Sequence, residues 1–184
     1  MTIHDARVEA TTIDGLELHH TKVLGDDRGM LAELLQGGSA NPVLAPGFGN
    51  CYLSIAIGKH TGRAAHVHRV LHERFFTVTG SAVWFFYDLR DDSATAGRSF
   101  TCVLGYARPP DAIAGPAAFL DERDMVRMVV PPGVYHAYWP LTEAPVVVLS
   151  VASLPYDDAD YDRRAPATIP GCRDALAAYG IRIA

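Results

Sequence analysis

Residues 62–80 have the sequence GRAAHVHRVLHERFFTVTG, in which three histidines and one glutamate fall within eight residues of a β-like run. His66 and His68 are two apart, and side chains at i and i+2 of a strand point to the same face. Their imidazoles can therefore converge on one point. The carboxylate of Glu73, which opens the next expected strand, can complete the set. The stretch is compatible with a metal site, an acid–base site or a polar strand edge.

Short runs of β-forming residues recur along the chain, separated by breakers such as ANPVLAPGFGN and ARPPDAIAGP. Many short strands with Gly- and Pro-rich turns indicate a sandwich or barrel rather than alternating strands and helices. The run 29–36 is compatible with strand or helix, and Gly80-Ser81 between two runs indicates a hairpin. The other expected strands lie at 50–59, 73–80, 81–90, 99–105, 125–132 and 144–153.

The C-terminal region carries the one convincing helix signal. Pro170 and Gly171 precede CRDALAAYG, and Gly180 suits the position just past a helix end. The charged segment LPYDDADYDRRAP (154–166) is expected to be a surface connection. We expect a single domain, with a core at about 23–155 and a helical tail at about 156–184.

Composition excludes several classes of protein. The 184 residues carry a formal net charge of −5 and no basic patch, so we expect no nucleic-acid partner. The N-terminus lacks the apolar stretch of a signal peptide, and the longest late apolar run, PVVVLSVASL, is too short to span a bilayer. The three cysteines, Cys51, Cys102 and Cys172, lie far apart, which predicts no disulfide framework and a cytoplasmic location.

A further ligand for a metal has to come from elsewhere in the chain. The segment VVPPGVYHAYWP offers His136, three residues after a Pro-Pro-Gly turn. Imidazole and carboxylate ligands together suit divalent first-row metals. Histidines are more often structural, but Glu73 would be costly to bury without ionic partners. His72 is expected on the opposite side of the strand, and His4, His19, His20 and His60 show no spacing signal.

These residues resemble the two motifs of the cupin superfamily. HVH, four residues, Glu73, six residues and Gly80 is similar to HxH(x)3–4E(x)6G, and PPGVYH is similar to PxGxxH, with Pro140 in place of an expected asparagine. The resemblance implies an all-β cupin jelly roll (a double-stranded β-helix), here with a short C-terminal helix. It also implies a divalent metal ion (Fe, Mn, Ni or Zn) held by His66, His68, Glu73 and His136.

A second resemblance covers about residues 23–155. DDRGMLAELLQ, VWFFYDLRDDSATAGR and VVPPGVYHAYWPLTEA look like segments of the dTDP-4-dehydrorhamnose 3,5-epimerase family. This likeness implies that Arg28, Glu33 and Arg63 contact a nucleotide diphosphate and that His66 is the catalytic base. Because that family forms jelly-roll dimers that exchange an N-terminal strand, we expect a homodimer with a small-molecule substrate such as a nucleotide-linked sugar.

The departures from that family concern its catalytic residues. Its lysine aligns with Glu73, its general-acid tyrosine falls near Val148, and its histidine-bound aspartate has no clear counterpart within 154–166. Without the lysine and the tyrosine, the usual mechanism lacks its oxyanion stabiliser and its proton donor. The sequence therefore indicates an epimerase-like scaffold in which a metal set replaces that apparatus.

The leading hypothesis is a metal-dependent, epimerase-like cupin enzyme that isomerises or epimerises a keto-sugar or related polar metabolite through a metal-stabilised enolate. The expected catalytic residues are His66, His68 and Tyr138, with Tyr135 and His72 as further proton-shuttle candidates. The expected substrate-binding residues are Arg28, Glu33, Arg63 and Arg90, because guanidinium groups suit phosphate. Arg90 is almost equally well explained as a surface salt-bridge partner.

Three alternatives stay open. An Fe(II)-dependent cupin oxygenase would need an apolar pocket, for which the aromatic candidates are Tyr52, Phe76, Phe85, Tyr87, Tyr138 and Trp139, with Phe76 and Phe85 favoured as core. A metal-free sugar 3,4-ketoisomerase would use the histidine pair, since RAAHVHR at 63–69 is similar to the RGxHAHKxxxQ-like motif of those enzymes. A sugar-binding cupin without turnover is less attractive, because it has no need for an open metal position.

Overall fold

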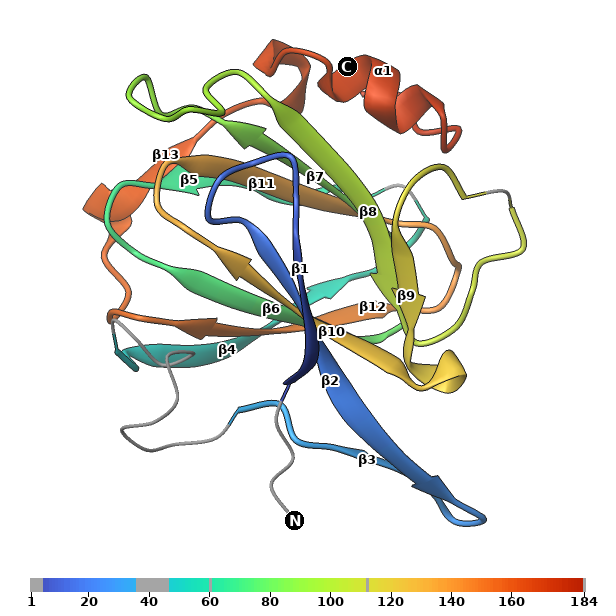
Figure 1. The fold of residues 1–184 in the computed structure, drawn as a ribbon. Helices are drawn as coiled ribbons and strands as arrows, with labels where there is room; N and C mark the ends of the chain where they lie inside the picture. Colours follow the sequence, from blue (N-terminus) through green and yellow to red (C-terminus); the bar gives the residue numbers. More distant parts are fainter. Residues whose placement is uncertain (1–4, 36–46, 60, 112, 184) are drawn as a thin grey trace.

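The computed structural model describes residues 5–35, 47–59, 61–111 and 113–183. Strands dominate this part of the chain (Figure 1). They are β1 (Asp5–Ala10), β2 (Glu17–Asp26), β3 (Gly29–Ala32), β4 (Asn50–Ala56), β5 (Arg63–His68), β6 (Glu73–Thr79), β7 (Ser81–Asp88), β8 (Ser99–Gly105), β9 (Ala117–Phe119), β10 (Asp124–Val130), β11 (Val134–Pro140), β12 (Val146–Ala152) and β13 (Tyr161–Arg163). The helical elements are α1 (Cys172–Ala177) and the 3-10 turns η2 (Leu120–Glu122), η3 (Asp158–Asp160) and η4 (Pro166–Thr168).

Two sheets face each other. Over the described residues, the larger sheet has the order β1-β2-β10-β6-β12-β4, with β3 added to β2, and the smaller sheet has the order β13-β5-β11-β7-β8-β9. Every pairing is antiparallel except that of β8 with β9. The predicted all-β jelly roll with a short C-terminal helix is confirmed.

The hairpin predicted at Gly80-Ser81 is wrong. Strand β6 pairs with β10 and β12 in the larger sheet, whereas β7 pairs with β8 and β11 in the smaller one. The chain crosses between the sheets at Gly80, which has a φ of 62°. A Cβ atom here would come within 2.8 Å of Cγ2 of Val146 and 2.9 Å of the carbonyl oxygen of Pro145. Only glycine fits both this backbone conformation and this space.

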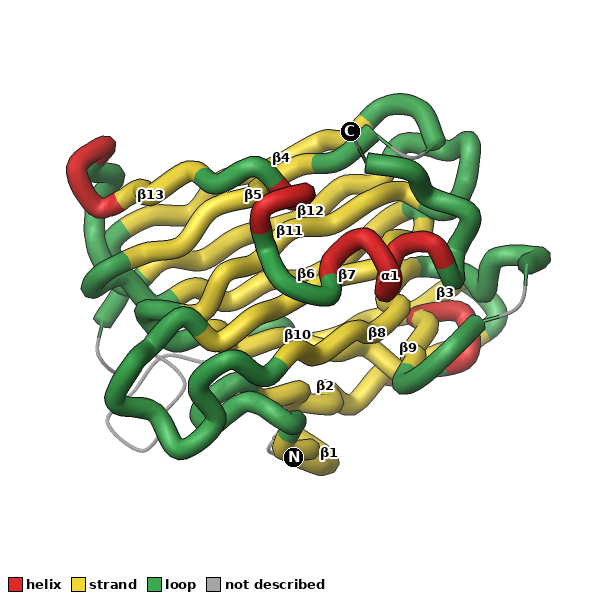
Figure 2. Tube along the Cα trace, turned by 90° about the horizontal axis from the view of Figure 1, so that it is seen from above, coloured by secondary structure: helices red, strands yellow, loops and turns green. Residues whose placement is uncertain are grey.

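Alternation along the strands divides the buried side chains among three cores. The core between the sheets includes Trp84, Met128 and Val148. The outer face of the smaller sheet is covered by the C-terminal segment, where Leu176 packs in the same cluster as Phe85. Figures 1 and 2 show α1 lying across β7 and β8 on this side. The outer face of the larger sheet carries a third cluster, built from Phe76, Met125 and Val151.

The tail differs from the surface connection predicted for residues 154–166. Strand β13 pairs with β5 and places Tyr161 opposite His68, so this segment forms the edge of the smaller sheet. The predicted helix is present as α1, and it closes with a hydrogen bond from the amide of Ile181 to the carbonyl of Leu176 beside Gly180, whose φ is 71°. No helix in the described ranges is both long enough and apolar enough to cross a membrane.

Candidate metal centre and adjoining pocket

Neighbouring strands of the smaller sheet position the three histidines. His66 and His68 lie on β5, and the register of β11 places His136 opposite His66. Ala64 and Ala65, just before them, have φ values of 65° and 61°. Left-handed backbone costs an L-residue about 1–2 kcal/mol, and such strain gathers at functional sites.

Four side-chain atoms meet between the sheets, as the sequence predicts. Nε2 of His66 lies 3.1 Å from Nε2 of His68 and 3.1 Å from Nε2 of His136. Oε2 of Glu73 lies 3.1 Å from Nε2 of His68, 3.0 Å from Nε2 of His136 and 3.9 Å from Nε2 of His66. All four atoms lie within 4.8 Å of one another. Ligands bound at about 2.1 Å to an octahedral ion lie about 3.0 Å from their neighbours, so the cluster has the spacing of a metal site.

Glu73 contributes the carboxylate from β6 in the opposite sheet and is only 1% exposed. Its second oxygen, Oε1, accepts hydrogen bonds from the hydroxyl of Tyr52 and, at 3.0 Å, from that of Ser150. Burial alone would raise the pKa of this carboxyl, but hydrogen bonds from the three histidines hold the pKa well below its ordinary value. Glu73 is therefore ionised and presents Oε2 to the cluster.

Acceptors hold the remaining ring nitrogens of two of the histidines. Nδ1 of His68 lies 3.0 Å from Oδ2 of Asp160, and Nδ1 of His136 lies 3.1 Å from the carbonyl oxygen of Val134. A ring nitrogen that faces an acceptor carries the proton, so Nε2 of each neutral ring bears a lone pair.

Both of these lone pairs point at the anionic Oε2 of Glu73, at 3.0–3.1 Å. Such an arrangement is repulsive unless a cation lies between the atoms, either a metal ion or an added ring proton, which turns Nε2 into the hydrogen-bond donor that lowers the pKa of Glu73. Ligating histidines also characteristically donate their second ring N–H to a carboxylate or a carbonyl. The residues present therefore fit a divalent metal ion.

A pocket of about 270 Å³ adjoins the cluster and includes His66 in its wall. Its lining combines cationic, hydroxyl and apolar side chains, among them Tyr52, Ser54, Arg63, Phe75, Tyr138, Val148, Tyr161 and Arg163. This mixture suits a polar, anionic ligand better than a purely apolar one. Val148, near which the epimerase tyrosine was placed by resemblance, is in the wall, and other strands supply the tyrosines.

Tyr138 is the predicted proton-shuttle residue that the structure places in this pocket. Its hydroxyl lies 2.8 Å from Oγ of Ser54, which also accepts a hydrogen bond from Nε of Arg63 at 3.0 Å. Burial raises the pKa of Tyr138, so the hydroxyl keeps its proton at neutral pH. Tyr135 packs instead in the cluster on the outer face of the smaller sheet, and His72 is not part of the pocket wall.

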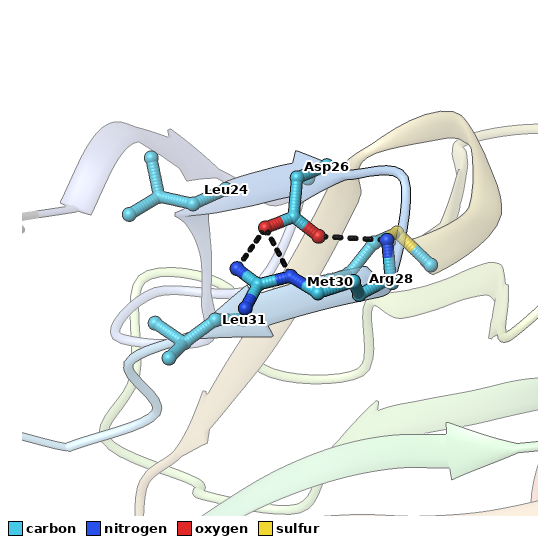
Figure 3. A pocket seen from close by; sticks show the side chains of 7 residues that line it. Leu24, Asp26, Arg28, Met30 and Leu31 are labelled. Atoms are coloured by element: carbon cyan, nitrogen blue, oxygen red, sulfur yellow. Dashed lines mark hydrogen bonds and ion pairs between the residues drawn. The ribbon is translucent and has the colours of Figure 1, made fainter.

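Arg28 and Glu33 do not reach the pocket within one chain. Arg28 lies on the turn between β2 and β3, a hairpin that projects from the body (Figure 1), and Glu33 follows β3. Figure 3 shows the guanidinium of Arg28 beside Asp26, with a shortest N–O distance of 2.5 Å. The shallow pocket around them contains none of the four clustered residues.

Arg90 is also engaged elsewhere. Its Nε lies 2.8 Å from Oδ1 of Asp88, and one terminal nitrogen donates at 2.7 Å to the carbonyl oxygen of Asp14. The hydroxyls of Ser93 and Thr95 each donate to Oδ2 of the buried Asp88 at 2.7 Å. This contact matches the salt-bridge interpretation, and the role of Arg90 toward a substrate stays a prediction.

Several residues at the site were not predicted from the sequence. Asp160 and Tyr161 come from the charged tail segment, where no hydrophobic alternation marks a strand. The ring of Tyr161 lies 4.9 Å from that of His66 and 4.3 Å from that of His68. Burial, with the charge of Glu73, raises the pKa of Tyr161 to about 12. Asp160 supplies the histidine-bound aspartate that the sequence did not reveal, although it bonds His68 rather than His66.

No family model matches this chain. Among curated proteins, the spore coat polysaccharide biosynthesis protein SpsL of Bacillus subtilis (strain 168) is 28% identical over 157 residues, which cover 84% of this chain and 89% of that protein.

Solved structures resemble the fold over most of its length. The dTDP-sugar isomerase from Desulfovibrio desulfuricans G20 superposes with a TM-score of 0.70 at 20% identity, covering 88% of this chain and 92% of that chain. The dTDP-4-dehydrorhamnose 3,5-epimerase from Elizabethkingia anophelis NUHP1 gives 0.68 at 16% identity, covering 88% and 81%. A Legionella pneumophila Philadelphia 1 3,5-epimerase in complex with dTDP-4-keto-L-rhamnose gives 0.67 at 19% identity, covering 85% and 76%. The chain therefore has a cupin fold similar to that of dTDP-sugar epimerases and isomerases.

Proposed function

We propose that this protein is a metal-dependent epimerase or isomerase that acts on a nucleotide-linked keto-sugar. The observation that carries the proposal is the convergence of three imidazole nitrogens and one carboxylate oxygen beside a pocket that also presents guanidinium groups. A divalent ion bound by His66, His68, Glu73 and His136 would polarise a substrate carbonyl and so ease removal of a proton from the adjacent carbon.

Two tyrosines of the pocket can donate a proton to the substrate. Tyr138 keeps its hydroxyl proton at neutral pH because burial raises its pKa, and Ser54 and Arg63 hold that hydroxyl in place. Tyr161 is likewise protonated and lies against His66. The base that takes the proton from carbon is His66, which lines the pocket and whose pKa is lowered by burial, so that its ring is neutral. His68, Glu73 and His136 would then retain the ion, and the two hydroxyls are the donors that return a proton to carbon.

Two arginines give the pocket its affinity for an anion. Arg63 begins β5, Arg163 pairs opposite His66 on β13, and both residues line the pocket. The guanidinium of Arg163 also pairs with Asp158 at 2.8 Å at the surface. Forked guanidinium groups bind phosphate oxygens in pairs. The solved relatives named for dTDP-sugars, and the naming of SpsL for polysaccharide synthesis, support a nucleotide-linked sugar as the substrate class.

The same observations rank the alternatives. An oxygenase with an apolar substrate is less favoured, because arginines share the pocket with apolar residues such as Phe75 and Val148. A metal-free ketoisomerase that uses the histidine pair is retained as the second alternative, because His66 lines the pocket and its Nε2 lies 3.1 Å from Nε2 of the buried His68.

The test combines metal content with solvent exchange. Untagged protein and the His68→Ala variant are analysed by metal mass spectrometry and then incubated with a dTDP-linked 4-keto-sugar in D2O. We expect about one equivalent of a divalent metal and metal-dependent uptake of deuterium, both lost in the variant. Deuterium uptake that survives metal removal would instead establish the metal-free histidine-pair mechanism. Failure to incorporate deuterium, combined with O2 consumption by the iron form, would establish the oxygenase.

A homodimer is part of the proposal. The β2–β3 hairpin carries exposed Leu24, Met30 and Leu31, and Arg28 lies among them, away from the pocket of its own chain. A partner that receives this hairpin would cover the apolar side chains. Light scattering should give twice the 19.9 kDa of one chain, and a charge at Leu31 should reduce that mass to one chain.

We further propose that residues 1–184 form one cupin unit and that the protein works in the cytoplasm. The pairing of β13 with β5 and the packing of α1 on the smaller sheet support the single unit. Three free thiols, at Cys51, Cys102 and Cys172, support a reducing compartment.

A further inference from the structure

Asp160 is a buried carboxylate with both oxygens occupied. It is 6% exposed, and its Oδ2 lies 3.0 Å from Nδ1 of His68. Its Oδ1 accepts backbone N–H bonds from Arg69 at 2.8 Å and from Val70 at 2.9 Å. A buried carboxylate is tolerated only where such charge-assisted bonds replace its hydration. These contacts fix the side chain of Asp160 in one orientation.

We propose that Asp160 is a positioning residue that fixes the tautomer of His68, so that Nε2 of His68 presents a lone pair to the other three clustered side chains. This role would serve the metal-dependent function proposed above, and the inference rests on that function to this extent. The hydrogen bond between Asp160 and His68 does not depend on that function. His68 is 2% exposed, so solvent does not compete for Nδ1. Two carboxylates flank this ring, with Oδ2 of Asp160 at 3.0 Å from Nδ1 and Oε2 of Glu73 at 3.1 Å from Nε2. We expect the proton on Nδ1, because Oε2 of Glu73 is shared with Nε2 of His136 at 3.0 Å, and a metal ion bound at Nε2 leaves the ring N–H to Asp160.

The tail is built to hold this carboxylate in place. Asp160 ends η3, whose first turn is capped by the side chain of Asp157 accepting from the amide of Ala159. The next residue, Tyr161, opens β13 and pairs opposite His68. The corresponding hydrogen bond of His136 goes to a backbone carbonyl, that of Val134, which no substitution can remove. His68 is therefore the ligand whose tautomer a single side-chain change can test.

Asp160→Asn should invert the tautomer with little change in shape. The amide oxygen must face the backbone N–H groups of Arg69 and Val70, because the opposite rotamer would place the amide NH2 against these two N–H donors. The amide NH2 then faces Nδ1 of His68 and donates to it, so the ring proton moves to Nε2. A protonated Nε2 cannot ligate, and loss of such an outer partner typically weakens metal binding about 10–100-fold.

The experiment measures the tautomer and the metal affinity separately. Ring nitrogens of ¹⁵N-histidine-labelled, metal-free protein are observed by NMR at a pH where the rings are neutral, and zinc affinity is measured by competition with a chelator. We expect a protonated Nδ1 of His68 in the wild type and a protonated Nε2 in Asp160→Asn, with zinc affinity about 10–100-fold lower. The matched control is Asp162→Asn, two residues further along the chain in β13, whose carboxylate pairs at the surface with Arg164 at 2.8 Å. The control should change neither quantity.

The outcomes separate this inference from the proposed function. A wild-type His68 protonated on Nε2 overturns the inference, whether or not the variant folds. An unchanged tautomer in folded Asp160→Asn, with zinc affinity equal to that of Asp162→Asn, also overturns it. If the tautomer inverts but the wild type binds no zinc, Asp160 retains its positioning role while the metal-dependent function fails.

Discussion

The hydroxyl of Tyr52 on β4 donates to Oε1 of Glu73 on β6, although β12 runs between these two strands. Ser150 on β12 donates to the same oxygen at 3.0 Å. Three adjacent strands of the larger sheet thus orient one carboxylate, whose other oxygen is left to face the histidines of the smaller sheet. The orientation of Glu73 depends on hydroxyl donors that are distant in the sequence.

Removing the Tyr52 hydroxyl should loosen this carboxylate. In Tyr52→Phe, Oε1 of Glu73 keeps only the bond from Ser150, so we expect about 10-fold weaker zinc binding and a loss of about 1–3 kcal/mol in the free energy of unfolding. Chelator competition and urea unfolding measure the two effects. In the control Tyr156→Phe, the lost hydroxyl bonds the exposed Asp158, so both quantities should stay near wild type. Equal behaviour of the two variants would contradict the role of Tyr52.

A bound metal ion should stabilise the folded protein. Zinc at 100 times its dissociation constant adds about 2.7 kcal/mol to the free energy of unfolding, which raises Tm by about 5–10 °C in a chain of this size. Calorimetry with and without a chelator measures the shift. Glu73→Gln removes the anionic ligand but keeps the shape, so zinc should leave its Tm unchanged. A variant that responds to zinc as the wild type does would place the metal elsewhere.

Arginines in the pocket wall should govern nucleotide binding. Arg63→Gln and Arg163→Gln each remove a charge from the pocket, and we expect each to weaken dTDP binding about 10-fold or more, as measured by calorimetric titration. Arg90→Gln provides the comparison, because Arg90 is held by Asp88 outside the pocket wall. If Arg90→Gln weakened dTDP binding as much as the pocket variants, the anion would have to lie on the Arg90 side.

The Asp88–Arg90 pair should contribute stability that disappears in acid. Burial of Asp88 would raise its pKa, but bonds from Arg90, Thr95 and Ser93 hold the pKa below its ordinary value. A lowered folded-state pKa gives stability that is fully present above the unfolded value of about 3.9 and is lost as the pH falls below it. Asp88→Asn should therefore cost about 2–3 kcal/mol at pH 7 and progressively less below about pH 4. A cost independent of pH would show that the charge of Asp88 is not involved.

The crossing between the sheets should tolerate only glycine. Gly80→Ala combines a left-handed φ with a Cβ atom 2.8 Å from Cγ2 of Val146, so we expect a loss of about 2–4 kcal/mol in the free energy of unfolding. Gly97 also has a positive φ, 76°, but its nearest neighbour is the Tyr87 hydroxyl at 3.6 Å. Gly97→Ala should cost only about 1 kcal/mol. Equal losses in the two variants would mean that the backbone conformation alone, and not the close approach, sets the cost.

Local patterns predicted strands β4, β6, β7, β8, β10 and β12 and the shared face of His66 and His68, because period-2 alternation and i, i+2 spacing are properties of the local chain. Strands β1, β2, β9 and β13 were not predicted. The pairing of strands was not predictable in the same way. Gly80-Ser81 has the composition of a tight turn, yet the partners of β6 and β7 are chosen by burial between the two sheets.

The sequence also did not predict the residues that contact the four clustered side chains. Asp160 and Tyr161 lie in a charged segment whose composition resembles that of a loop, and only the pairing of β13 with β5 brings them to the histidines. Tyr52 was predicted only as a pocket aromatic, since its bond to Glu73 depends on strand order. Arg28 was placed near the substrate by resemblance, and within one chain it lines a different pocket from the one beside the histidines.

The origin of the four ligand atoms has one more consequence. Three imidazoles belong to the smaller sheet and the carboxylate of Glu73 belongs to the larger one, so a bound ion would join the two layers as an interlayer cross-link. Any change that separates the layers, even far from the ligands, would weaken binding, and binding would resist that separation by the same free energy. Metal affinity would then measure how closely the two sheets are held together. It would therefore detect core substitutions that shift the sheets but leave the circular dichroism spectrum unchanged.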